Sequence, residues 1–410
     1  MYKKMDKVDI VIIGGGFSGL IALNKFIEEG YKNIVLISAE DLGTGQSLHN
    51  HGWLQHGYTM FPDLNSMEYV YQNTDKFLKL IPQNCIATAG ECYISVPKYM
   101  ARDSSKYFNQ INLPFSIVDE SQLPILVTGG GLTLDSTIIQ AKNDCIILKQ
   151  RALQHFANRF QNHIFKGQVK EIKLNSENIC KLSVLLPNGN EYYLSTDMVV
   201  LAAGGGNQSL IQSISSVAVS KNILQQESKI FQSSRLFHML CIRGPVELLP
   251  KVTFSSDVFF SSYVDEKANE TVWIMHGPIE LARNIHPFNQ PLTQKHSVQN
   301  LLKDMFKSMP KLKSIVNDLK WGVFACYKSD GKTGYLPSVP NVGVLFPGLF
   351  SLTVNAIETL LVNIESKQIK PNDTVPDLDV LKDVVDVGDQ NEDTVEYFDW
   401  NTFSRTYNFQ

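Results

Sequence analysis

Hydrophobic and turn-forming residues alternate in a regular order over the first forty positions of the chain. An apolar run at Asp9–Ile13 ends in glycines, and a second apolar run occupies Ile34–Ser38. Gly30 stands where an intervening helix would end. Between the two runs, apolar residues recur at helical spacing, namely Leu20, Leu23, Phe26 and Ile27. The pattern predicts a strand, a helix and a second strand, which together form a βαβ unit.

Similar patterns predict further helices and strands. We expect two helices whose core faces are apolar stripes: Met67, Val70, Tyr71, Phe77, Leu78 and Ile81 in the first, and Val298, Leu301, Leu302, Met305, Phe306 and Met309 in the second. We expect strands at Cys92–Val96, Phe165–Leu174, Lys181–Leu186, Met198–Ala202 and Thr271–Met275. A hairpin turn is expected at Pro187-Asn188-Gly189-Asn190.

The last part of the chain departs from this pattern. After about residue 370 the sequence turns acidic and loses its periodicity, first at Pro371-Asn372-Asp373 and then at Asp386–Glu396. We interpret this part as a surface appendage or a loose tail. No linker-like segment divides the rest of the chain, which suggests that the chain passes between its domains several times.

Composition narrows the class of protein. The 410 residues include 43% hydrophobic side chains, and 37 Lys and Arg against 41 Asp and Glu give a net charge of −4. These values exclude a mainly disordered chain, and the length allows two or three domains. The charged fraction of 19% and the slight acidic excess provide no basic surface for nucleic acid or anionic lipid. A small molecule is therefore the expected partner.

Short apolar runs and scattered cysteines bear on location and metal binding. Val8–Ile13 is far shorter than a membrane span and is followed by glycines, so we expect neither a membrane span nor an export signal. The six cysteines show no metal-ligand spacing. We therefore expect buried, reduced thiols, no metal site and a cytoplasmic protein.

The glycine-rich turn is the strongest chemical signal. The segment Gly14–Gly19 (GGGFSG) fits GxGxxG directly after a predicted strand and at the start of a predicted helix. Gly14 permits the tight turn, Gly16 lets the main chain approach a pyrophosphate, and Gly19 allows close packing of helix on strand. The free N–H groups and the dipole at the helix N-terminus favour the phosphates. Glu40 follows the second strand, where it can accept hydrogen bonds from a ribose diol.

Two further features favour a single dinucleotide held by separated segments. Met198–Gly205 is an apolar strand that runs into small residues, as expected where a later strand returns to the same sheet. Gly129-Gly130-Gly131 lacks the third glycine of the motif, because Leu134 stands in its place. The motif alone leaves open whether the dinucleotide is FAD or NAD.

At this point the chain resembles the FAD-dependent oxidoreductases of the D-amino acid oxidase type. The segment Gln46–Gly57 (QSLHNHGWLQHG) is similar to the Gln-Thr-Gly-His-Asn-Ser-Gly stretch beside the flavin in the branch that oxidises 2-hydroxyglutarate. Four residues match that stretch: Gln46, His49, Asn50 and Gly52. The chain departs from the family pattern where Leu48 replaces a glycine and His51 a serine, and where, beyond the stretch, Gln55 replaces a histidine that occurs one place later as His56. The departures bear on the substrate more than on the cofactor.

Later segments extend the resemblance over most of the first 365 residues. Phe165–Ile172 is similar to the strand whose main chain meets the adenine, at the position of Val169, and Ala202–Gly204 to the turn near the pyrophosphate. Pro347–Thr353 resembles the last FAD-contacting loop, and the helix after it, capped by Ser351 or Thr353, would present its positive end to the flavin. The motif and the resemblance together assign these residues to FAD: Gly14, Gly16, Phe17, Ser18, Gly19, Glu40, Gln46, Ser47, His49, Asn50, Val169, Ala203, Gly204, Gly348, Leu349, Phe350, Ser351, Leu352 and Thr353.

The resemblance implies an α/β fold of two domains. A Rossmann-like FAD-binding domain of the glutathione-reductase type would be discontinuous, with residues 1–82, 142–215 and 320–370. A second, α+β substrate domain built on a mixed or antiparallel sheet would contain residues 83–141 and 216–319. Residues 371–410 would form the acidic C-terminal appendage.

The resemblance also implies the reaction, which is oxidation of a C–N or C–O bond with hydride transfer to flavin N5. His49, His51 and His56 are candidate catalytic residues, because histidine titrates in the range that a base requires. One of them could contact the flavin, face the substrate or be a covalent attachment point. The alternative is that main-chain carbonyls hold these histidines in a tight loop.

An acid substrate would need a cationic partner, and a guanidinium offers two parallel hydrogen bonds to a carboxylate. Arg243 lies in Ile242-Arg243-Gly244, which is similar to an Arg-Gly motif of the substrate domain. Arg283, after Gly277-Pro278, and Lys328 are further candidates by motif position. Each of them has a surface or interdomain charge as its alternative.

We therefore expect a FAD-dependent oxidoreductase, an oxidase or a dehydrogenase, that acts on a small amine, amino acid or hydroxy acid. Two alternatives stay open: a flavoenzyme of specialised metabolism with a larger or carrier-bound substrate, and a flavin-binding subunit without turnover. The sequence leaves oxygen, a quinone and an electron-transfer protein open as the electron acceptor.

Overall fold

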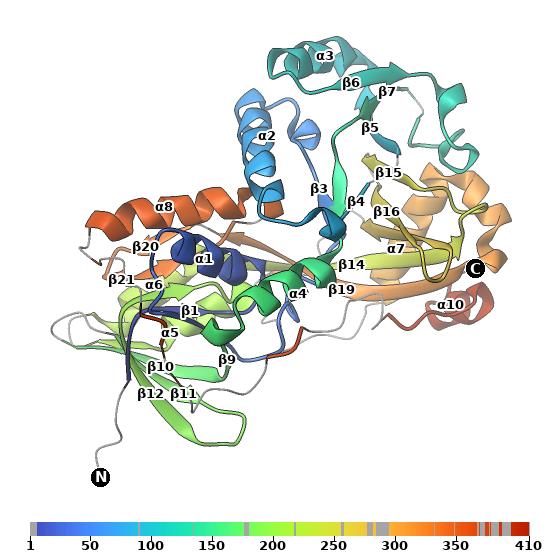
Figure 1. Ribbon diagram of the computed structural model, residues 1–410. Coiled ribbons are helices and arrows are strands. Elements are labelled where there is room, and N and C mark those ends of the chain that lie inside the picture. Colours follow the sequence, from blue (N-terminus) through green and yellow to red (C-terminus); the bar gives the residue numbers. More distant parts are fainter. Residues whose placement is uncertain are drawn as a thin grey trace.

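The computed structural model describes residues 6–88, 91–133, 135–175, 180–216, 219–255, 258–276, 282–283, 295–331, 333–347, 349–366, 369, 374–376, 378, 385–387 and 395–409. For residues 230–236, 282–283, 325–331, 363 and 365–366 it describes the main chain alone. Within these ranges the strands form two large sheets and one small sheet, with helices around them (Figure 1).

The first large sheet starts from the predicted βαβ unit. β1 (Asp6–Ile13) pairs in parallel with β2 (Ile34–Ser38), and α1 (Phe17–Glu28) connects them. The strand order is β13-β10-β11-β12-β1-β2-β9, with β21 beside β12 and β20 beside β21. The other strands of this sheet are β9 (Ile164–Lys166), β10 (Gln168–Leu174), β11 (Cys180–Leu185), β12 (Glu191–Leu201), β13 (Ile214–Ser216), β20 (Gly334–Leu336) and β21 (Val339–Val344).

The predicted strands of this sheet are present with changed bounds. The predicted strand Phe165–Leu174 is divided into β9 and β10 at Gly167, whose N–H donates to Ser38 O at 2.9 Å. β12 begins before the predicted Met198, because the predicted hairpin pairs it with β11. In that hairpin Gly189 has a φ of +81°, which is the conformation that its turn requires.

Side chains of the first sheet alternate between two cores. Ile10, Ile12 and Val200 face a core shared with α1, α4 (Lys149–Arg159) and α8 (Thr353–Ser366). Val11 and Val199 face the opposite core, which includes residues of α5 (Asn207–Gln212) and α6 (Lys221–Phe231). The sheet is therefore covered on both faces, and its near-continuous apolar strands reflect that burial.

The second large sheet is mixed, as the sequence predicts. β17 and β18 pair with successive parts of the long β14, and β19 pairs with β14 along almost its whole length. β15 pairs with β5 in parallel, whereas the other pairs are antiparallel. Its strands are β5 (Glu91–Pro97), β6 (Phe115–Val118), β7 (Ser136–Ala141), β14 (Gln232–Pro245), β15 (Val252–Ser255), β16 (Phe259–Asp265), β17 (Glu270–His276), β18 (Ala282–Arg283) and β19 (Lys320–Gly331).

Helices and a small third sheet complete the two halves. α7 (Lys295–Ser308) packs on one face of the second sheet in a core with Trp273 and Trp321. α2 (Leu64–Leu78) and α3 (Ala101–Gln110) contribute to the core on the other face. The third sheet contains β3 (Trp53–Leu54), β8 (Cys145–Ile147) and β4 (Ile86–Thr88), paired in that order.

The strand β19 bears on one predicted domain boundary. Residues 320–370 were expected in the first domain, but β19 pairs with β14 from Arg243 with Lys320 to Gln232 with Gly331. The first sheet resumes only at β20. We therefore propose that the second domain extends to the end of β19, and we keep the remaining division as a proposal.

The described residues of the C-terminal segment contact both large sheets, in contrast to a loose tail. Beside the first sheet, Leu42 N–H donates to Asp386 O at 2.7 Å. Beside the second sheet, Trp321 and Phe398 exchange two main-chain hydrogen bonds of 2.9 and 2.8 Å. α10 (Trp400–Thr406) then packs on the same core as α7. These contacts involve single residues at irregular spacing, so the hydrophobic periodicity of the sequence could not predict them.

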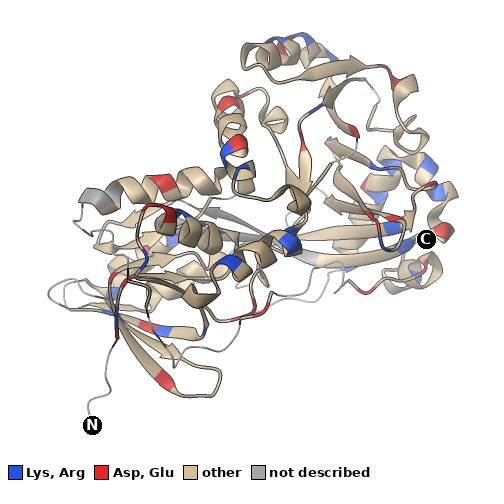
Figure 2. Cartoon of the chain, in the orientation of Figure 1, with Lys and Arg blue, Asp and Glu red and all other residues tan. Residues whose placement is uncertain are grey.

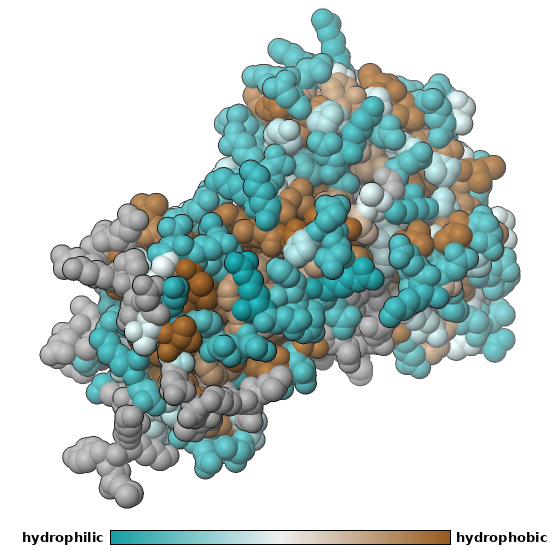
Figure 3. Space-filling view, viewed as in Figure 1, coloured by the Kyte–Doolittle hydropathy of each residue, from teal (hydrophilic) through white to brown (hydrophobic). Residues whose placement is uncertain are grey.

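The outer surface is mostly polar, with mixed charge. On the face shown in Figure 2, Lys and Arg are interspersed with Asp and Glu. Figure 3 shows hydrophobic residues gathered between the part built on the first sheet and the part built on the second. None of the helices in the described ranges is long and apolar enough to cross a membrane. The described cysteine side chains are buried, as expected, and Cys326 lies outside them.

Candidate functional site

The glycine turn between β1 and α1 is closed by contacts between main chains. Gly14 has a φ of +123°, and a Cβ at Gly14 would lie 2.5 Å from Ala202 O. A Cβ at Gly19 would lie 2.0 Å from Gly14 O. Neither position has room for a side chain, so the sequence motif preserves the close approach of helix, turn and strand that dinucleotide binding requires.

Residues 46–50 lie against this turn and are held by hydrogen bonds. The backbone N–H of Phe17, the first residue of α1, donates to the Ser47 hydroxyl at 2.9 Å. Asn50 Nδ2 donates to Gln46 O at 2.7 Å. The buried ammonium of Lys149 donates to two main-chain oxygens of the segment, at 3.0 and 2.6 Å. The segment beside the helix start is therefore shaped before any ligand binds.

Other residues assigned to FAD follow strands of the first sheet. Glu40 comes two residues after β2, and its side chain is exposed. Ala203 and Gly204 follow β12, the strand beside β1. Val169 is buried in β10, next to a shift in its register with β11. The carboxyl ends of β1, β2 and β12 thus meet at one edge, where parallel sheets bind nucleotides.

A cavity of about 380 Å³ lies where these segments meet the second sheet. Part of its lining comes from segments assigned to FAD and their neighbours: Phe17, Ser18, Gln46, Ser47, Asn50, Gly204, Leu345, Phe346, Pro347, Leu349, Phe350, Ser351 and Thr353. The rest comes from the loop after residue 50 and from the second sheet: His51, Trp53, Leu54, Gln55, Thr59, Met60, Phe237, Met239, Phe259 and His276. The cavity therefore joins the predicted flavin contacts to a second wall.

Aromatic rings dominate this second wall. The ring centroid of Phe259 lies 4.7 Å from those of His51 and Trp53, and 5.3 Å from that of His276. Phe237 lies 5.8 Å from His276. Phe259 and His276 are register partners on β16 and β17, which brings their side chains to one face of the sheet. The wall is mostly apolar, and its polar side chains are the two imidazoles, Gln55 and Thr59.

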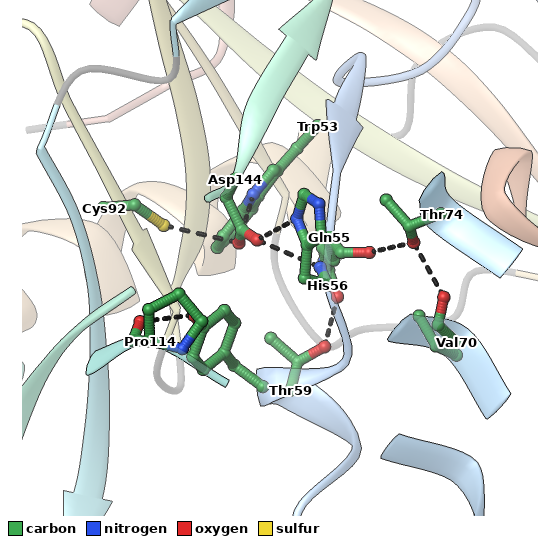
Figure 4. Close-up of polar contacts among 10 residues, drawn as sticks. Trp53, Gln55, His56, Thr59, Val70, Thr74, Cys92, Pro114 and Asp144 are labelled. Atoms are coloured by element: carbon green, nitrogen blue, oxygen red, sulfur yellow. Dashed lines mark hydrogen bonds and ion pairs between the residues drawn. The ribbon is translucent and has the colours of Figure 1, made fainter. Parts of the chain in front are cut away.

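A buried carboxylate behind the wall holds the loop that carries Trp53 (Figure 4). Asp144 accepts hydrogen bonds from Trp53 Nε1 at 2.8 Å and from the backbone N–H and Nδ1 of His56, each at 3.0 Å. Cys92 Sγ lies 3.6 Å from the same carboxylate. Burial and the Asp144 charge raise the pKa of the Cys92 thiol, so the thiol is the donor. This cluster fixes the shape of the cavity from behind.

The structure separates the three predicted histidines. His51 lines the cavity, whereas His56 is buried with Asp144 and lies outside the lining. His49 also lies outside it, with Nδ1 2.8 Å from Gly45 O. Burial lowers the pKa of His49, which favours a neutral ring bound to the main chain. We therefore keep only His51 of the three as a candidate for chemistry.

Arg243 lies away from the cavity. It is six residues beyond Phe237 on β14, which is about 20 Å along an extended strand. Its guanidinium forms ion pairs with Asp265 and with Glu270, the latter at 3.0 Å. These partners explain its place in an apolar segment, so we no longer assign Arg243 to the substrate. Leu352 is outside the cavity lining. Gly348 and the side chain of Lys328 lie outside the described residues, so their predicted roles stay predictions.

Several residues of the site were missed in the sequence, and three of them matter most to its shape and chemistry. His276 directly precedes the Gly277-Pro278 pair, and a histidine at the end of a predicted strand beside a noted motif could have indicated it. Phe259 belongs to a short apolar stretch without a special pattern. Asp144 becomes meaningful only through tertiary contacts, because its partner His56 is 88 residues away in the sequence.

A parallel βαβ sheet with a glycine turn, joined by a cavity to a second sheet, defines a dinucleotide-dependent oxidoreductase. The chain belongs to a family whose model is described as FAD dependent oxidoreductase and matches residues 9–353. FAD is therefore its cofactor, as the sequence predicts. A sequence comparison with curated proteins gave no match.

Solved structures confirm the fold. A FAD dependent oxidoreductase from Pseudomonas aeruginosa is 16% identical with a TM-score of 0.64, covering 95% of this chain and 99% of that chain. L-proline dehydrogenase from P. horikoshii is 13% identical with a TM-score of 0.65, covering 90% and 96%. L-alpha-glycerophosphate oxidase from Mycoplasma pneumoniae, with FAD bound, is 14% identical with a TM-score of 0.65, covering 88% and 95%. At these identities the likeness concerns the fold alone.

Proposed function

We propose that this chain oxidises the C–N or C–O bond of a small amino acid or hydroxy acid. The observation that carries the proposal is the cavity, because it joins segments assigned to FAD to a wall from the second sheet. When bound, FAD accepts the hydride that leaves the substrate carbon. The protein then has to orient the substrate, exclude water and take up a proton.

The described residues fit FAD. The Gly14–Gly19 turn would hold the pyrophosphate, since neither Gly14 nor Gly19 leaves room for a Cβ and α1 begins at Phe17. Glu40 would bind the ribose, and the main chain at Val169 the adenine. Residues 46–50, 203–204 and 349–353 would contact the rest of the cofactor. The N-terminus of α8 at Thr353 borders the cavity, where its positive end would stabilise negative charge on the flavin.

A row of three basic residues on neighbouring strands favours an anionic group on the substrate. In the main-chain register Arg235 of β14 pairs with Arg283 of β18 and with Lys328 of β19. Arg235 is two positions from Phe237, which lines the cavity. We assign this row to the substrate carboxylate. L-proline and L-alpha-glycerophosphate, which appear in the names of two similar structures, both carry an anionic group.

The size and walls of the cavity favour a small substrate. The flavin would take part of the cavity of about 380 Å³, so the space that is left suits a small substrate. The aromatic wall with Trp53, Phe237 and Phe259 would exclude water from the reacting carbon and pack on the substrate's carbon skeleton.

Anaerobic reduction of the purified holoprotein tests the proposal. We expect the yellow absorbance to bleach with at least one acidic member of a panel of amines, amino acids, hydroxy acids and glycerophosphate. Bleaching only by amines without an acid group would overturn the acid-substrate proposal. A protein that retains FAD and is bleached by none of these compounds would overturn the enzymatic one.

The cation row has its own test. Arg235→Gln, Arg283→Gln and Lys328→Gln are each expected to raise KM for the acid at least about tenfold while FAD stays bound, because each would remove the charge-assisted hydrogen bond that this proposal gives to the substrate carboxylate. Lys98→Gln is the matched control, since Lys98 forms an exposed ion pair with Asp135 at 3.7 Å. Equal KM values for all four variants would remove the row from the site.

A further inference from the structure

Two histidines face the same part of the cavity. The ring centroids of His51 and His276 are 6.5 Å apart, and Phe259 lies beside both. Among the described residues that line the cavity, these two are the only ones whose side chains ordinarily titrate near neutral pH. Proton transfer in this part of the cavity therefore falls to one of them.

Hydrogen bonds fix the tautomer of His51. The backbone N–H of Trp53 donates to His51 Nδ1 at 3.0 Å, so Nδ1 supplies a lone pair and carries no hydrogen. The neutral ring then carries its hydrogen on Nε2, which is therefore a hydrogen-bond donor. The Ser261 hydroxyl donates to His51 O at 2.7 Å and holds the main chain in place. Protonation of Nδ1 would break the bond to Trp53, so His51 is poorly suited to accept a proton.

His276 is placed differently. It is the last residue of β17 and pairs with Phe259 of β16 on one side and with Met239 of β14 on the other. Both partners also line the cavity. Because β17 lies between β14 and β16, His276 has a paired strand on each side and therefore a well-defined position. A proton acceptor requires such a position.

We propose that His276 accepts the proton of the substrate and that His51 is a fixed donor. The proposal rests on the proposed function, because it assigns the proton of that same reaction. A substrate with an ammonium N–H or hydroxyl O–H loses a hydride from carbon and this proton from nitrogen or oxygen. The hydride and its two electrons pass to FAD, the proton passes to an imidazole nitrogen of His276, and a C=N or C=O bond forms. The imidazolium later returns its proton to water.

His51 would act on the ground state and the reacting state alike, by donating from Nε2 to an oxygen of the substrate. His276 would act only as the bond to hydrogen breaks. The two roles predict different kinetics, since uniform binding affects KM and a proton transfer affects the rate of the chemical step.

Anaerobic stopped-flow measurement of flavin reduction tests this division. His276→Gln is expected to lower the limiting rate roughly 100-fold to 10,000-fold, with the dissociation constant of the substrate changed less than about threefold. His51→Asn keeps an oxygen near the place of Nδ1 but lacks the Nε2 hydrogen, so it is expected to weaken substrate binding about tenfold with a smaller change in the limiting rate. His296→Gln is the control, because His296 is exposed on α7.

A second measurement needs neither FAD nor substrate. NMR spectra of ¹⁵N-histidine-labelled apoprotein report the tautomer of each imidazole. The signals of His51 are identified because they are absent from the His51→Asn variant, and they should show the tautomer with hydrogen on Nε2. A His51 with hydrogen on Nδ1 would overturn the proposal, and it would do so even if the His276→Gln protein failed to fold.

The kinetic outcomes separate this proposal from the proposed function. If no compound of the panel reduces the wild-type flavin, the proposed function fails first. If a compound reduces the wild type and His276→Gln at the same limiting rate, the proposed function stands and the role of His276 is wrong.

Discussion

The backbone N–H of Phe17 donates to the hydroxyl of Ser47, with 2.9 Å between nitrogen and oxygen. Phe17 is the first residue of α1, whose first N–H groups have no partner within the helix. Ser47 belongs to residues 46–50, which the resemblance assigns to FAD. One hydrogen bond therefore connects the glycine turn to the second cofactor segment.

Ser47→Ala should weaken FAD binding. Loss of the hydroxyl leaves the Phe17 N–H without this partner and loosens residues 46–50 beside the turn. A net cost of about 1 kcal/mol for one hydrogen bond corresponds to a roughly fivefold higher dissociation constant. Quenching of flavin fluorescence on titration with apoprotein measures it. Ser314→Ala, at an exposed site on another element, is the control, and equal affinity in both variants would contradict the role of Ser47.

Asp144→Ala should destabilise the apoprotein strongly. The substitution leaves Trp53 Nε1 and two nitrogen donors of His56 buried without their acceptor. Such a loss costs about 3–5 kcal/mol in the free energy of unfolding. Urea denaturation followed by tryptophan fluorescence measures this change. Asp103→Ala, on the exposed face of α3, should change it by less than about 0.5 kcal/mol.

The segments assigned to FAD could be located in the fold from the sequence, because their signals are local. The turn at Gly14 and Gly19 depends on residues next to each other in sequence, and the strands on both sides show plain apolar runs. The segment from Gln46 to Asn50 follows the second strand directly. Because these residues are close in sequence to the ends of predicted strands, the sequence alone could place them at one edge of the sheet.

The substrate half could not be predicted, because its residues meet only through strand register. Phe259 and His276 become neighbours when β16 pairs with β17, and Asp144 reaches Trp53 across 91 residues of sequence. For Arg243 the sequence predicted a contact that strand register rules out. Its position before a glycine suggested a ligand contact, whereas the register brings Asp265 and Glu270 to its guanidinium.

The stability of the protein should fall with acid through His238. This residue is buried on β14 with Nδ1 3.0 Å from Ser297 Oγ, and burial lowers the pKa of His238 to about 4, from 6.5. Between those values the unfolded chain binds a proton that the folded chain does not, so stability is complete above pH 6.5 and falls as the pH falls. From pH 7.5 to pH 5 the loss is about 2 kcal/mol.

Denaturation at the two pH values, compared with His238→Gln, isolates this contribution. The variant should lose less stability on acidification than the wild type by about this amount, whatever its stability at pH 7.5. His49 and His163, whose pKa values are also lowered by burial, are present in both proteins and cancel in the comparison. An identical loss in both proteins would show that His238 titrates normally.

The C-terminal helix α10 should be required for the stability of the part of the protein built on the second large sheet. Phe403 is fully buried and packs against Trp321 of β19, with 5.8 Å between ring centroids. Phe403→Ala should therefore lower the free energy of unfolding by about 3–5 kcal/mol, the usual cost of removing a buried phenyl ring. Asn401→Ala, on the exposed side of the same helix, should cost less than about 1 kcal/mol. A loose tail, as the acidic sequence suggests, would tolerate both substitutions equally, so denaturant unfolding of the two variants decides between the packed helix and the tail.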